Sequence, residues 1–67
     1  MQGKQLASRV YLPGEKVETP NGLGDVAGSM DTQRGHLVLV DHGQRGPGGV
    51  VLTIAYPVQL VEEVERD

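Results

Sequence analysis

Short stretches of the chain alternate apolar and polar residues with a period of two, the pattern of strands that bury one face. Residues 16–19 alternate in this way, and 25–30 form a second candidate strand, in which Gly28 predicts a bulge or a close backbone approach. The clearest strand is 36–41, His-Leu-Val-Leu-Val-Asp, and the fourth is 50–55, Val-Val-Leu-Thr-Ile-Ala. No long segment joins helical periodicity to a cap signal, so the pattern predicts an all-β protein.

Glycine, proline and asparagine mark the connections between these strands. Asn21-Gly22 fits the two central positions of a type I′ turn, which would reverse the chain compactly. The run 42–49 holds four of the ten glycines and is too permissive for regular structure, so we expect a loop there, either functional or a plain connector. Proline cannot donate to a sheet, so Pro57 should end the fourth strand. A single 3-10 turn fits over 56–59, before a short last strand that contains 60–64.

Two segments resemble the corners of SH3-like barrels. Residues 13–26, Pro-Gly-Glu-Lys-Val-Glu-Thr-Pro-Asn-Gly-Leu-Gly-Asp-Val, look like the opening strand and turn of such a barrel, and 56–60, Tyr-Pro-Val-Gln-Leu, look like its closing turn. The resemblance covers nearly the whole chain. It implies a five-stranded SH3-like barrel over 10–67, with a single 3-10 turn before the last strand, preceded by a flexible N-terminal arm over 1–9. Because this barrel hosts many unrelated roles, it does not identify a function.

The same frame is similar to that of the plasmid-encoded type II dihydrofolate reductases, SH3-like barrels that form a tetramer around a central pore. Gly14-Glu15-Lys16-Val17 and Tyr56-Pro57-Val58 carry this resemblance. Thr53-Ile54-Ala55 stands where the family has Val-Gln-Ile, so the glutamine that contacts ligand is missing and no catalytic residue carries over. The resemblance therefore implies only an alternative, a pore-forming oligomer that binds a small ligand such as a pteridine or a nicotinamide.

Composition removes several classes of site from the 67 residues. There is no cysteine, which excludes disulfides and thiolate zinc sites. Two tyrosines without Phe or Trp are too few for an aromatic cage, a proline-peptide groove or a base-stacking platform. On one strand, His36 and His42 would stand about 20 Å apart, too far to share a metal ion. No phosphate-loop or nucleophilic-triad motif is present. We therefore expect a protein that is not an enzyme, with no catalytic residue, cofactor or metal.

The charge balance bears on partners and location. The formal net charge is −3, which disfavours nucleic acid because non-specific affinity comes mostly from phosphate neutralisation. A nucleic-acid-associated barrel stays an alternative if folding brings Lys16, Arg34 and Arg45 together. No stretch approaches the roughly 18 apolar residues of a membrane span, and the N-terminus lacks the apolar region of a signal peptide. The sequence thus predicts a cytoplasmic protein without a membrane partner.

The strongest positive feature is the apolar character of both faces of the third and fourth strands. In the fourth strand, Leu52 and Ile54 share one face while Val51 and Ala55 share the other. A lone small barrel would expose one of these faces to water. The leading hypothesis is a small non-enzymatic interaction module that uses this strand 3/4 face to form a homo-oligomer or to bind a partner protein; packing of the N-terminal arm or the glycine-rich loop over it is the other possibility. The candidate interaction residues are Arg45, Val51, Leu52, Ile54 and Tyr56.

Overall fold

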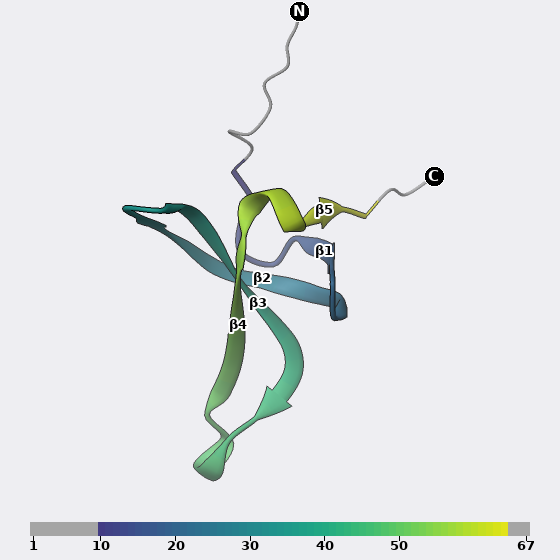
Figure 1. Ribbon diagram of the computed structural model, residues 1–67. Helices are drawn as coiled ribbons and strands as arrows, with labels where there is room; N and C mark the ends of the chain where they lie inside the picture. The colour runs from purple at the N-terminus through teal and green to yellow at the C-terminus, as the bar shows by residue number, and fades with distance from the viewer. Residues whose placement is uncertain (1–9, 65–67) are drawn as a thin grey trace, which may run out of the picture.

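One antiparallel sheet contains the five strands found in residues 10–64 (Figure 1). The computed structural model describes residues 10–64, so the predicted arm over 1–9 lies outside the described residues. The strands are β1 (Lys16–Thr19), β2 (Gly22–Thr32), β3 (Gly35–Arg45), β4 (Val51–Pro57) and β5 (Glu62–Glu63). Two single-turn 3-10 helices, η2 (Pro47–Gly49) and η3 (Val58–Leu60), precede β4 and β5. The all-β prediction is confirmed.

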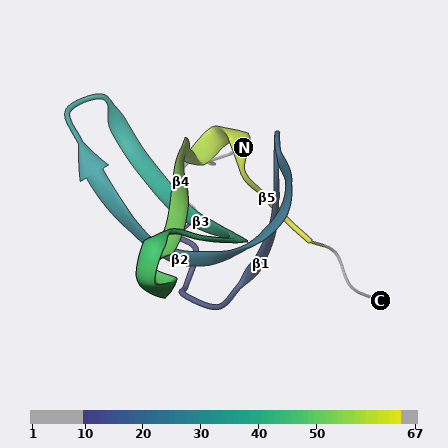
Figure 2. The same cartoon turned by 90° about the horizontal axis from the view of Figure 1, so that it is seen from below.

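The strand order is β4-β3-β2-β1-β5, so the first four strands form a meander and β5 returns to lie beside β1. The sheet is not closed into a barrel, which corrects the closure expected from the sequence. Closure would need β4 to pair with β5, whereas β4 pairs with β3 and β5 forms only a two-residue ladder with β1. In Figure 2 the sheet curls, and η3 leads from β4 towards β5 across its open side.

The predicted 3-10 turn before the last strand is present as η3, but the described residues contain a second one, η2, over the glycine-rich run. That run is also shorter as a loop than predicted, because β3 continues through Arg45. Two strands run longer than their apolar patterns: β2 and β3 each have 11 residues. Strand pairing therefore extends into polar segments that carry no period-two signal.

The turns that follow β1 and β2 share one arrangement. Thr19 Oγ1 accepts the backbone N–H of Asn21 at 3.1 Å and donates to the carbonyl oxygen of Gly22 at 2.9 Å. Thr32 repeats this pattern in the turn that ends at Gly35. Gly22 and Gly35 both have a positive φ. Among the described residues, only glycines do. The compact reversal predicted at Asn21-Gly22 is confirmed, because Thr19 pairs with Gly22 across the turn. A type I′ turn needs a positive φ at Asn21, so the predicted turn type is wrong.

The predicted irregularity at Gly28 is a bulge, because the register of β2 against β3 shifts between Val26 and Gly28. The close backbone approach occurs at another glycine. A Cβ at Gly24 would overlap Cγ1 of Val40 and lie 3.0 Å from the carbonyl oxygen of Asp41. Only glycine lets β2 approach β3 this closely at that point.

The core is small and consists mainly of valine side chains. Val17, Val38 and Val40 are its fully buried residues. The Tyr11 hydroxyl donates to the carbonyl oxygen of Val61 at 3.1 Å, which ties the segment before β1 to the segment before β5. Among the described residues, the buried apolar ones are Tyr11, Val17, Val26, Val38, Val40, Tyr56 and Val61. No helix in the described part of the chain is long and apolar enough to cross a membrane.

Candidate interaction surface

Four exposed aliphatic side chains lie on and directly before β4, which is an edge strand. Val50 is 57% exposed, Val51 49%, Leu52 45% and Ile54 39%. We call these four residues the β4 edge surface. Because β3 pairs with one side of β4 only, the other side of this strand has no neighbouring strand within residues 10–64.

The register of β4 against β3 explains why some apolar residues are buried and others are not. Val38 lies opposite Tyr56 and Val40 lies opposite Ile54. Val38, Tyr56 and Val40 are buried in the core, whereas the side chain of Ile54 is only partly covered. The β3–β4 hairpin extends away from the rest of the sheet (Figure 1), and Leu52 on β4 is 45% exposed.

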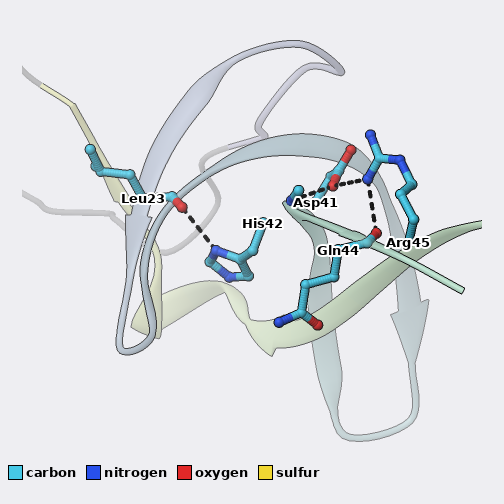
Figure 3. Close-up of polar contacts among 6 residues, drawn as sticks. Leu23, Asp41, His42, Gln44 and Arg45 are labelled. Carbon is cyan, nitrogen blue, oxygen red and sulfur yellow. Dashed lines mark hydrogen bonds and ion pairs between the residues drawn. The ribbon is translucent and has the colours of Figure 1, made fainter.

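A hydrogen-bond network joins three strands of the sheet. The Nδ1 atom of His42 lies 2.8 Å from the carbonyl oxygen of Leu23 (Figure 3), and its Nε2 lies 2.8 Å from the Tyr56 hydroxyl. The carbonyl can only accept, so Nδ1 carries the proton of the neutral ring and Nε2 accepts from Tyr56. Asn21 Nδ2 donates to the same hydroxyl at 2.9 Å. The network thereby connects β4 through β3 to β2 and the β1–β2 turn.

A second polar cluster lies at the end of β3, next to the loop of the β3–β4 hairpin (Figure 3). Asp41 Oδ1 accepts the backbone N–H of Gly43 at 2.7 Å and Nη1 of Arg45 at 3.0 Å, and this Nη1 also donates to the carbonyl oxygen of Gln44 at 2.8 Å. Hydrogen bonds hold the pKa of the Asp41 carboxyl below its ordinary value. The bond from the Gly43 N–H has the larger effect and the bond from the Arg45 guanidinium the next largest. These bonds order the segment that the glycine content predicted as a loop.

The structure places the predicted interaction residues in three different settings. Val51, Leu52 and Ile54 are exposed on the β4 edge surface. Arg45 lies opposite Val51 in the register and is bound to Asp41. Tyr56 is 5% exposed and belongs to the core, so it is not part of this surface. The contact of His42 with Tyr56 was missed, because the two residues lie on different strands and are 14 positions apart.

The three cations of the nucleic-acid alternative do not form one patch. Lys16 Nζ lies 3.2 Å from Asp25 Oδ1, and Arg45 is paired with Asp41. Arg34 lies in the turn before β3, whereas Arg45 is the last residue of that 11-residue strand. The histidines are separate as well, and residues 10–64 contain no group of three or more His, Asp or Glu side chains that could hold a metal ion.

Comparisons with protein-family models, with curated proteins and with solved structures find no match for this chain. The candidate site therefore rests on the geometry of β4 and its surroundings.

Proposed function

We propose that this chain is a small non-enzymatic interaction module, a variant of the SH3-like barrel, that self-associates through the β4 edge surface. Two features support the fold assignment: the resemblance implies five strands and a 3-10 turn before the last strand, and residues 10–64 contain both. The open side between β4 and β5 is the departure from a closed barrel. It leaves β4 available for a partner strand.

The observation that carries the proposal is an edge strand without charge. Residues 46–61 include the whole of β4 and contain no Asp, Glu, Lys or Arg. Proteins normally protect sheet edges with charged residues, proline or very short strands, because an exposed apolar edge is a template for another chain. The opposite edge has two of these features: β5 is two residues long and consists of Glu62 and Glu63. The β4 edge has one of these features, Pro57 at its last position, but β4 is seven residues long and uncharged. The contrast between the two edges supports a partner strand on β4.

Molar mass in solution tests the proposal directly. Light scattering over a concentration series should show a dimer or larger oligomer for the unmodified chain. Leu52→Glu and Val51→Glu should each shift the equilibrium to monomer, because a carboxylate would be desolvated in the interface. Met30→Glu is the matched control, since Met30 is 48% exposed on β2, two strands away from this edge.

Far-UV circular dichroism of each variant should retain the β signal of the unmodified chain. A chain that is monomeric at every concentration would refute self-association and leave a different protein as the partner of this surface. Equal loss of association in Met30→Glu and Leu52→Glu would show that the β4 edge surface is not the interface.

A further inference from the structure

The backbone of β4 has a defined set of outward-facing polar groups. The carbonyl oxygen of Val50 accepts the N–H of Gly46 at 2.7 Å, so it faces β3. Pro57 has no N–H and therefore fits a position whose backbone nitrogen faces away from β3. Backbone groups of alternate residues in a strand point to the same side. The N–H and C=O groups of Val51, Thr53 and Ala55 consequently face away from the sheet.

From this alternation, and resting on the proposed self-association, we infer that two copies of the chain pair their β4 strands antiparallel across a two-fold axis at Thr53. The axis at Thr53 places Thr53 opposite its own copy and Val51 opposite Ala55, so every outward N–H and C=O of the three residues obtains a partner. The result is one continuous ten-stranded sheet made from two five-stranded sheets.

Neighbouring registers satisfy fewer groups. An axis at Leu52 would place Ala55 opposite Gly49, which belongs to η2 and not to the strand. An axis at Ile54 would place Val51 opposite Pro57, which has no N–H to donate. Register in a sheet is set by the pattern that leaves the fewest groups unpaired, so Thr53 is the favoured centre.

The side chains agree with the same register on both faces. On the core side, Leu52 of each copy lies opposite Ile54 of the other, which gathers four aliphatic side chains that are 45% and 39% exposed in the single chain. On the other side, Val51 lies opposite Ala55. Aliphatic cross-strand pairs of this kind stabilise antiparallel strands, and threonine opposite threonine is also favourable. No like charges meet within the paired strands.

The β4 edge of a second copy fits this edge better than the β5 edge does. The β5 edge offers only two residues, and both are glutamates. Each copy has a formal net charge of −3 located outside residues 46–61, so the two copies repel each other only at long range. Added salt screens that repulsion. The dimer should therefore persist or strengthen with salt, whereas a complex with nucleic acid would weaken steeply.

A charge exchange at the axis tests the register. Thr53→Lys and Thr53→Glu should each be monomeric at concentrations where the unmodified chain is dimeric, because each places like charges opposite each other. An equimolar mixture of the two variants should form a heterodimer at least tenfold more readily than either variant forms a homodimer. A mixture that stays monomeric, or single variants that remain dimeric, would overturn pairing at Thr53.

Hydrogen exchange of the backbone amides then separates edge pairing from stacking of sheet faces. In the dimer, the amides of Val51, Thr53 and Ala55 should exchange at least tenfold more slowly than in monomeric Leu52→Glu, whereas Ile54, bonded to β3, should be protected in both. No change at the three odd-numbered positions would refute strand pairing. If Leu52→Glu still abolishes association in that case, the proposed self-association stands and only the edge-paired arrangement fails; a monomeric unmodified chain refutes both.

Discussion

Replacing Gly24 with alanine tests the closest approach between two strands of the sheet. The added Cβ would overlap Cγ1 of Val40 and lie 3.0 Å from both the carbonyl oxygen of Asp41 and Nδ1 of His42. Val40 is fully buried and the Asp41 carbonyl belongs to the backbone, so neither can move aside freely. Overpacking of this kind costs about 1–3 kcal/mol. Alanine in place of glycine regains about 0.4–1 kcal/mol by restricting the unfolded chain.

Gly28→Ala is the matched control, because Gly28 lies in the same strand and nothing lies within 4 Å of a Cβ there. The gain from the unfolded chain is common to both variants, so the difference between them isolates the overlap. Gly24→Ala should unfold with a free energy about 1–3 kcal/mol lower than that of Gly28→Ala. For a domain of this size, that separates the Tm values by roughly 4–24 °C.

Urea unfolding followed by far-UV circular dichroism, with both variants at one protein concentration, measures this difference. Equal stability of the two variants would refute the reasoning, because it would mean that β2 and β3 are not held together closely at Gly24. A stability of Gly28→Ala equal to or above that of the unmodified chain would confirm that the effect is specific to one glycine.

Two further predictions concern the polar clusters around β4. Tyr56→Phe removes the hydroxyl that donates to His42, so the free energy of unfolding measured in urea should fall by about 1–3 kcal/mol. The same change should cost less in a His42→Ala background, and an undiminished cost there would contradict the coupling between the two residues. The bonds from Gly43 and Arg45 lower the pKa of Asp41 in the folded state, so its contribution to stability is present above its ordinary value of 3.8 and is lost as pH falls through the lower folded value. The stability difference between the unmodified chain and Asp41→Asn at neutral pH should therefore vanish in strong acid, and a constant difference would contradict the assignment.

Local patterns along the chain were sufficient for the class of fold and for most of its elements. The apolar alternation of 16–19 and the β-rich runs 36–41 and 50–55 mark strands because a pleated chain with one buried face requires a period of two. Gly28 marked a bulge, and Pro57 marked the end of β4, because each residue restricts or frees the backbone at its own position. The apolar character of both faces of β4 was also visible in the sequence.

Only the tertiary structure decided how these elements are arranged. Whether β4 meets β5, and hence whether the sheet closes, depends on pairing between strands far apart in the chain. The close approach at Gly24 arises from Val40 on another strand, and the burial of Tyr56 arises from Val38 opposite it and from His42. The residue pattern along the chain indicates the backbone conformation that each position favours. Register, strand order and the resulting free edge are set by contacts across the sheet.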